Sequence, residues 1–184
     1  MRQLFVSTTA ILLLAATASV AQETSLVGFP TSADNTQYTR QHVIEVDDVP
    51  GHQIRVFAIR RTFPKDPPII GGLALKEQLS RGLTDYISNS GTGNFYGTYV
   101  LENGDKFFTR SSLVAHKAGA GLSSITVGRI TGGTGKFATM QGEVRTLVTS
   151  DQAAGINEGF TTIEYVLNPE TDAKASRAPA AGQR

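Results

Sequence analysis

The chain has 184 residues, with 17 basic and 16 acidic side chains, a formal net charge of +1 and no cysteine. A nucleic-acid-binding domain normally carries a clear basic excess, so we expect no nucleic-acid partner. The lack of cysteine excludes a disulfide framework and a lipoprotein acylation site. With 40% hydrophobic residues, a chain of this length can form one domain with its own core.

The first 21 residues have the pattern of a cleaved secretory signal. Arg2 precedes an apolar stretch from Ala10 to Ala16, and Ser19 and Ala21 occupy the small-residue positions that a signal peptidase requires. The apolar stretch is much shorter than the ~20 residues of a membrane span, so we expect no integral membrane segment. The alternative is an uncleaved N-terminal anchor.

Cleavage after about Ala21 would remove Arg2 and leave basic residues equal in number to the 16 acidic ones. It would also place the protein outside the cytoplasm, either secreted or in the periplasm of a bacterium. A cysteine-free chain in such a compartment is held together by packing alone, which suits a bacterial periplasm or medium better than a disulfide-rich extracellular module.

Three regions are predicted after the signal. Residues 22–38 are polar without sustained periodicity and are expected to be an unstructured N-terminal extension, partly pinned to the domain by Leu26, Val27 and Phe29. Residues 39–168 form the predicted domain. Residues 169–184 are rich in alanine, proline and charge, and they are expected to be a disordered tail because they cannot bury enough apolar surface to become ordered.

Alternating apolar and polar residues, punctuated by glycines, predict β-strands through the domain. Residues 41–47 and 53–63 form the first predicted hairpin, which turns at Pro50-Gly51. The next segment, PKDPPIIGG, is predicted to be a crossing loop because proline cannot donate to a β-ladder. The most helix-like piece, residues 73–87, is interpreted as an edge strand followed by a strand over residues 83–89.

The second half of the domain continues the pattern. NFYGTYVL and DKFFTRSSL are joined at Asn103-Gly104, which is the strongest short hairpin signal in the chain. GLSSITVGRI, FATMQGEVRTLVTS and EGFTTIEYVL complete about eight strands. An open sheet of this size without helices would expose its edges, so we predict an all-β fold in which one antiparallel β-barrel is closed. A β-sandwich is the alternative.

The glycine-rich segment RITGGTGKFATMQGEV, residues 129–144, is not a phosphate-binding loop. A Walker sequence needs glycine, four residues, and then Gly-Lys-Ser/Thr, but Ile130 stands where the first glycine belongs and Phe137 where the hydroxyl belongs. We interpret the glycines of residues 132–135 as a tight connection between two strands, where a positive φ or a close backbone approach is needed.

The same segment resembles a known family. ITGGTGKFATMQGEV is similar to the GGTG-basic-Phe-Ala…Gly signature of allene oxide cyclase and dirigent-like barrels, and TDYISNSGTGNFYGTYVLENGDKFFTR and NEGFTTIEY resemble bacterial exported members of the allene-oxide-cyclase-like group. The resemblance covers about residues 41–167. It implies a β-barrel that often oligomerises, so a homo-oligomer is an expectation by analogy. Plant cyclases convert a fatty-acid epoxide in an apolar cavity and dirigent proteins guide phenoxy-radical coupling, but no catalytic position of either can be carried over to this chain.

Charged residues that share the apolar face of a strand are expected to point into the barrel. This parity places five side chains inward, His42, Arg61, Glu102, Arg110 and Arg129, and three outward, Glu143, Arg145 and Glu164. An inward arginine without an acidic partner would suit the carboxylate of an amphiphile such as a fatty acid, because an unpaired buried charge is costly. The alternative is a set of salt bridges at the mouth of the barrel. The candidate ligand-binding residues are Phe57, Arg61, Tyr99, Glu102, Phe108 and Arg110.

Catalytic and metal templates are absent from the sequence. The three histidines lack an adjacent nucleophile motif and the spacing of zinc ligands, and Glu102 is the one carboxylate placed inward, where a glycosidase needs two. Turn chemistry explains DQAAGINEG and ENGD better than a calcium loop does. We therefore expect no metal and no cofactor.

The sequence thus predicts an exported β-barrel protein that binds a small hydrophobic or amphiphilic ligand. Two alternatives stay open. The first is a cyclase or isomerase that acts by confining its substrate, for which Tyr99, Glu102 and Arg110 are the residues to test. The second is a structural or oligomeric module whose interior is packed solid.

Overall fold

The computed structural model describes residues 23–151 and 153–167. The predicted signal peptide and the predicted tail of residues 169–184 lie outside the described residues. Within them the chain forms a ten-stranded antiparallel sheet with two short 3-10 helices and no α-helix, which confirms the all-β prediction. No helix in these ranges combines the length and the apolar character needed to cross a membrane.

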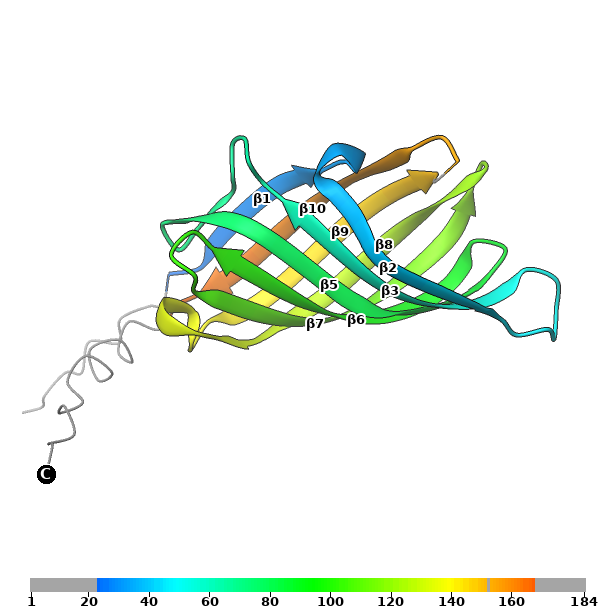
Figure 1. The fold of residues 1–184 in the computed structure, drawn as a ribbon. Coiled ribbons are helices and arrows are strands. Elements are labelled where there is room, and N and C mark those ends of the chain that lie inside the picture. The colour runs from blue at the N-terminus through cyan, green and yellow to red at the C-terminus, as the bar shows by residue number, and fades with distance from the viewer. Residues whose placement is uncertain (1–22, 152, 168–184) are drawn as a thin grey trace, which may run out of the picture.

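The strands run in simple succession through the sheet, in the order β1-β10-β9-β8-β7-β6-β5-β3-β2, and β4 pairs with β5 beside this path (Figure 1). Their bounds are β1 (Ser25–Thr31), β2 (Thr36–Glu45), β3 (His52–Thr62), β4 (Ile69–Ile70), β5 (Leu73–Ile87), β6 (Ser90–Leu101), β7 (Lys106–Ala118), β8 (Gly121–Gly133), β9 (Gln141–Asp151) and β10 (Ile156–Val166). The short helix η1 (Ala33–Asn35) connects β1 to β2, and η2 (Gly135–Phe137) lies between β8 and β9.

The sheet curls into a barrel shape whose two end strands, β1 and β2, are consecutive in the chain (Figure 1). A one-turn helix makes this connection, with Asn35 accepting a 3.0 Å hydrogen bond from the backbone N–H of Ser32. No β-ladder joins β1 to β2 within the described ranges. The sheet is therefore continuous and antiparallel, but hydrogen bonding does not close it as predicted.

Two predicted hairpins are confirmed and two segments differ from their predictions. The turns at Pro50-Gly51 and Asn103-Gly104 join β2 to β3 and β6 to β7. In contrast, β5 is one 15-residue strand between β3 and β6, because it pairs with both along most of its length. The proline-rich loop contains the two-residue strand β4, which folds back onto the start of β5.

The N-terminal segment that we expected to be unstructured is also part of the sheet. Strand β1 pairs with β10 from Ser25 opposite Tyr165 to Thr31 opposite Gly159. Its inward residues Phe29 and Thr31 are buried. The alternation is only seven residues long and includes a glycine and a proline, so its periodicity was too short to recognise.

The glycine-rich segment connects two strands as predicted, but the connection is longer than a tight turn. Strand β8 ends at Gly133, and the chain makes the η2 turn before β9 begins at Gln141. A Cβ atom at Gly133 would lie 2.5 Å from the carbonyl oxygens of Lys106 and Phe137, so the backbone passes too closely there for any other residue. The loop places Phe137 and Met140 in the core.

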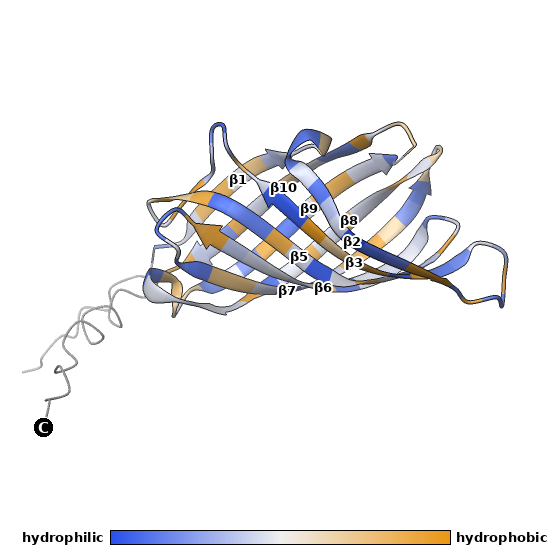
Figure 2. Ribbon diagram, viewed as in Figure 1, coloured by the Kyte–Doolittle hydropathy of each residue, from blue (hydrophilic) through white to orange (hydrophobic). Residues whose placement is uncertain are grey.

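The apolar core fills the end of the barrel that carries β4 and η2. Tyr99 stacks on Phe107 with a centroid distance of 4.3 Å, and Phe29 meets Phe63 edge to face at 5.5 Å. Its other buried members are Ile70, Leu75, Leu101, Ile130, Phe137, Met140, Val144, Ile163 and Tyr165. Apolar and polar residues alternate along the strands (Figure 2). Because the core occupies one end of the barrel, other side chains line the opposite half of the interior.

Candidate ligand-binding cavity

The half of the barrel away from the core contains a cavity of about 280 Å³. Inward side chains of β3 and of every strand from β5 to β10 line it. It extends to three turns at that end of the barrel, which contain Asn89, Ala120 and Ala153. We call this end the mouth. Small-molecule pockets have volumes of roughly 300–1,000 Å³, so the cavity is close in size to the smallest of them.

Short hydroxyl side chains create the space on one side of the cavity. The inward positions of β8 and β9 carry Ser124, Thr126, Thr146 and Ser150, where a packed core would have large apolar residues. Ser80, Thr84 and Ser111 continue the hydroxyl lining on β5 and β7. These side chains leave room for a ligand and can also donate or accept hydrogen bonds.

Aromatic rings line the facing wall. Phe57 on β3 and Phe95 on β6 are paired in register with Gly82 of the strand between them, and their ring centroids are 6.1 Å apart. A Cβ atom on residue 82 would lie 2.1 Å from the carbonyl oxygen of Asn94 and 2.3 Å from the Cβ of Phe95. The glycine therefore allows β5 to pass close to β6 beneath the two rings.

Arg61 is a buried cation in the cavity wall. Its side chain shares the inward face of β3 with Phe57 and is 9% exposed. The Nε atom donates a 3.0 Å hydrogen bond to the Oγ1 of Thr36, and none of the ion pairs among the described residues includes Arg61. Burial lowers the pKa of Arg61, although guanidinium groups stay protonated in proteins. The cavity therefore contains a positive charge without a counter-ion.

Tyr99 and Gln78 form a polar pair where the cavity meets the core. The side-chain amide of Gln78 donates a 3.2 Å hydrogen bond to the hydroxyl of Tyr99. Burial raises the pKa of Tyr99 far above its ordinary value of 10.0, and nearby Arg61 opposes that rise. The phenol is therefore neutral at physiological pH and can donate its proton in a hydrogen bond.

Unpartnered polar atoms are concentrated in this cavity. Five buried side-chain atoms in the described ranges lack a hydrogen-bond partner, and four of them belong to cavity-lining residues: Arg55 Nε, Gln78 Oε1, Thr84 Oγ1 and Asn157 Oδ1. Buried polar groups are nearly always hydrogen-bonded in folded proteins. These atoms can form hydrogen bonds with a ligand or with water.

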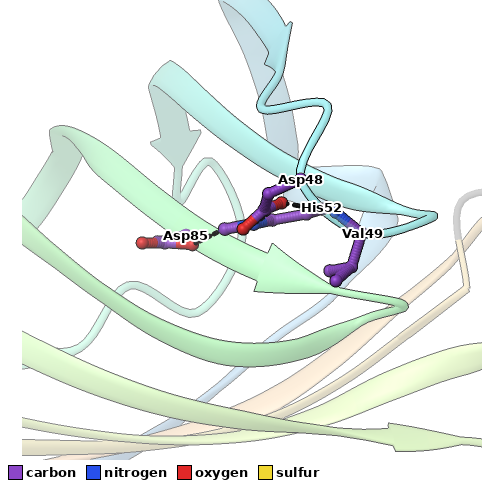
Figure 3. Close-up of polar contacts among 4 residues, drawn as sticks. All are labelled: Asp48, Val49, His52 and Asp85. Carbon is purple, nitrogen blue, oxygen red and sulfur yellow. Dashed lines mark hydrogen bonds and ion pairs between the residues drawn. The ribbon is translucent and has the colours of Figure 1, made fainter.

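A histidine between two carboxylates ties together the strands beside the mouth. His52 Nδ1 lies 2.5 Å from Oδ1 of Asp48, and its Nε2 lies 2.8 Å from Oδ1 of Asp85, which joins the β2–β3 turn to β5 (Figure 3). Asp48 also accepts a 2.7 Å hydrogen bond from the N–H of Val49. The bonds to Asp85 and Asp48 raise the pKa of His52, and the bond to His52 lowers the pKa of Asp48. The described residues contain no cluster of three or more potential metal ligands.

The structure brings together three of the six candidate residues. Phe57, Arg61 and Tyr99 line the cavity, whereas Glu102 and Arg110 are exposed and Phe108 is half-buried outside it. On β7 the inward residues are Phe107, Thr109 and Ser111. Glu102 follows the end of β6, where it accepts a 3.1 Å hydrogen bond from the N–H of Ala74.

The predicted inward parity was wrong for Glu102 and Arg110, and also for His42 and Arg129, all of which are exposed. The error has a physical cause, because the outer face of the barrel is itself apolar: Tyr96 is 65% exposed and Ile125 is 54% exposed. Apolar neighbours therefore indicated the wrong face of β6 and β8. The outward placement of Arg145 and Glu164 is confirmed, and Glu143 is half-buried beside the inward Val144.

Sequence reasoning missed several lining residues. Arg55 has the same parity as Phe57 and Arg61, so extending that alternation by one step would have found it. Gln78 was hidden by a bulge between Leu75 and Glu77, which changes the inward residues of β5 from odd to even numbers. The hydroxyl residues give no apolar signal at all.

Comparison with known proteins gives matches among solved structures. No family model matches the chain, and no curated protein matches it significantly. A solved structure with a similar course of the chain is that of a pterocarpan synthase dirigent protein, at 13% identity and a TM-score of 0.48, covering 86% of this chain and 99% of the other. Membership of the allene-oxide-cyclase-like group stays a prediction.

Proposed function

We propose that the protein binds a small amphiphilic molecule through an anionic group held by Arg61. The observation that carries this proposal is the buried guanidinium of Arg61, which faces the cavity and takes part in none of the ion pairs of the described chain. An uncompensated buried charge costs several kcal/mol. A carboxylate from a ligand would remove this cost, and arginine can hold it with two parallel hydrogen bonds.

The rest of the cavity supports an amphiphile rather than a small inorganic anion. Phe57, Ile59 and Phe95 provide an apolar surface, and the hydroxyl side chains of β8 and β9 provide scattered polar contacts. Export to the periplasm or medium, with cleavage after about Ala21, is part of the proposal and rests on the sequence pattern. Closure of the barrel around its ligand is also part of the proposal. It would need side chains or the ligand itself to cover the gap between β1 and β2.

The proposal is tested by mass spectrometry and by calorimetry. Native mass spectrometry of protein isolated from its own compartment should detect a retained organic acid. In titrations with dodecanoate, Arg61→Gln should weaken binding at least about tenfold, which corresponds to the loss of roughly 1.4 kcal/mol. Arg60→Gln, on the exposed face of the same strand, should leave the affinity unchanged. Equal affinity of the Arg61 variant and the unchanged protein would refute the proposal.

A turnover role has less support from the cavity. Of the three residues that the sequence offered for a cyclase or isomerase, only Tyr99 lines it, since Glu102 and Arg110 are exposed. Tyr99 keeps its proton at neutral pH because burial raises its pKa. A reaction in this cavity would therefore depend on confinement and hydrogen bonding, as the predicted alternative supposes, rather than on a paired acid and base.

A second proposal concerns self-association. Four apolar residues form a row across the outer face of four neighbouring strands, where each is directly paired with the next and at least half exposed. They are Phe160 on β10, Leu147 on β9, Ile125 on β8 and Val114 on β7. A contiguous exposed apolar row is typical of an interaction surface. Sedimentation velocity should show an oligomer that dissociates in Leu147→Glu. It should persist in the control Leu83→Glu, which changes an exposed leucine on β5, and a monomer at all concentrations would contradict the proposal.

A further inference from the structure

A second arginine shares the cavity with Arg61. Arg55 lies six residues earlier on the same face of β3, and both side chains line the cavity. We propose that the ligand is an elongated dianion, with one acidic group bound at Arg61 and the other bound at Arg55 near the mouth. This inference rests on the proposed function and specifies its ligand class.

The spacing of the two arginines matches an extended molecule. A strand advances about 3.3 Å per residue, so the Cα atoms of Arg55 and Arg61 are roughly 20 Å apart. Phe57 and Ile59 occupy the inward positions between them, and Phe95 contacts the same space from β6. A ligand that spans the two guanidinium groups therefore passes over an apolar surface, which favours an apolar or aromatic spacer between its acidic ends.

The Nε–H group of Arg55 has no hydrogen-bond acceptor among the described residues. Its Nε atom is buried without a hydrogen-bond partner, and none of the ion pairs among the described residues includes it. Arginine cannot lose its proton at physiological pH, so the charge remains. A ligand with one acidic group at Arg61 and a purely apolar tail would leave this buried N–H unpaired, which is unfavourable because buried polar groups are nearly always hydrogen-bonded.

Three carboxylates near the mouth accept hydrogen bonds from groups other than Arg55. Asp151 lines the cavity, but its Oδ1 accepts hydrogen bonds from the backbone N–H groups of Ala153 and Ala154. Glu45 accepts a 2.6 Å hydrogen bond from the amide of Gln53, and Asp85 is paired with His52. None of these three acids forms an ion pair with Arg55.

A further cation and a neutral phenol complete the mouth. A recess of about 310 Å³ there shares Arg55, Thr84, Tyr86, Asn89 and Ala120 with the cavity, and Lys117 also lines it. Burial raises the pKa of Tyr86 to about 12, so this phenol does not neutralise the neighbouring charge. The second acidic group of the ligand would therefore meet Arg55 directly, with Lys117 as an additional positive charge.

The inference is tested with diacids and their monomethyl esters, which have the same length and differ by one charge. Suberic, sebacic, dodecanedioic and hexadecanedioic acids, each with its ester, are titrated calorimetrically into the purified protein. For the best-fitting length, the diacid should bind at least about tenfold more tightly than the ester. Arg55→Gln should abolish that preference while the ester still binds as before. Arg61→Gln should weaken both ligands, and Arg60→Gln should change neither. Circular dichroism of each variant establishes that it is folded.

The outcomes separate this inference from the proposed function. If the diacid and the ester bind equally tightly at every length, the second anionic site is refuted while the binding of an amphiphilic anion at Arg61 stands. If a preference for the diacid exists but survives Arg55→Gln, the assignment to Arg55 is refuted. If neither ligand series nor dodecanoate binds, both proposals fail. A diacid preference that disappears only in the Arg55 variant supports the dianion.

Discussion

The amide of Gln78 and the hydroxyl of Tyr99 lie directly opposite each other on β5 and β6 and are joined by a 3.2 Å hydrogen bond. Both side chains are buried, and Oε1 of Gln78 already lacks a partner. Tyr99→Phe would leave the Gln78 amide with no partner among the described residues. We expect the free energy of unfolding in urea to fall by about 1–3 kcal/mol.

The same strand provides the control for this prediction. Tyr96 is on the outer face of β6, so Tyr96→Phe should change the free energy of unfolding by no more than about 0.5 kcal/mol. Equal losses in the two variants would show that the hydrogen bond between Gln78 and Tyr99 contributes nothing specific to stability.

Buried Tyr99 and half-buried Tyr86 also predict how stability changes at high pH. Burial raises the pKa of Tyr99 and raises that of Tyr86 to about 12, whereas an unfolded tyrosine has a value near 10. Between these values the unfolded chain loses protons that the folded chain retains, so stability should decrease as the pH rises above 10. The urea midpoint, measured at several pH values on either side of 10, checks this.

The double variant Tyr86→Phe/Tyr99→Phe removes both groups and therefore serves as the control for alkaline titration. Its midpoint should fall less steeply above pH 10 than that of the unchanged protein. An equally steep fall would assign the alkaline loss of stability to other groups.

The sequence was sufficient to predict the all-β class because strand alternation and turn chemistry are local signals. Pro50-Gly51 and Asn103-Gly104 determine their hairpins within a few residues. The pairing of β1 with β10 joins segments that are more than a hundred residues apart, and no local pattern in residues 25–31 reports it. The bulge in β5 is likewise a consequence of pairing with β6.

The cavity was harder to predict because small and hydroxyl residues face it, whereas a core is recognised by large apolar residues on the inward face. Apolar periodicity identifies an inward face only where that face is packed, and here Ser124 and Thr126 face the cavity while Ile125 and Val127 face outward. Arg61 was placed on the inward face correctly because Phe57 and Ile59, which share its parity on β3, also line the cavity. A search for alternating small and hydroxyl residues would have found the correct face of β8.

Gly82 should be intolerant of a side chain. In Gly82→Ala the added Cβ would overlap the carbonyl oxygen of Asn94 and the Cβ of Phe95, so β5 and β6 would have to separate beneath the aromatic wall. Overpacking of this kind typically costs about 1–3 kcal/mol, and we expect a urea midpoint lowered accordingly together with weaker ligand binding.

A glycine on β1 offers the comparison for Gly82. At Gly28 an added Cβ would meet mainly the far end of the exposed Phe160 ring, which can rotate away. Gly28→Ala should therefore have a smaller effect on stability and none on ligand affinity. If Gly82→Ala were as mild as Gly28→Ala, the close approach of the two strands would not be required for the fold.

The histidine between Asp85 and Asp48 should make stability depend on pH near neutrality. Its pKa is raised in the folded protein, first by the hydrogen bond to Asp85 and then by that to Asp48, so the folded state holds a proton that the unfolded state releases near pH 6.5. The resulting stabilisation is fully present below about pH 6.5 and is lost as the pH rises through the raised pKa of His52. NMR titration should show this raised value directly, and Asp85→Asn should move it back toward 6.5.

Protonation of Asp48 determines where the same interaction is lost at low pH. Because the bond to His52 lowers the pKa of Asp48, its contribution is lost as the pH falls through that lowered value. The urea midpoint should therefore decline on both sides of a mildly acidic optimum. His52→Gln should flatten the decline on the alkaline side, while His116→Gln, at an exposed position on β7, should leave it unchanged. A profile that His52→Gln does not alter would mean that this histidine does not couple the β2–β3 turn to β5 in solution.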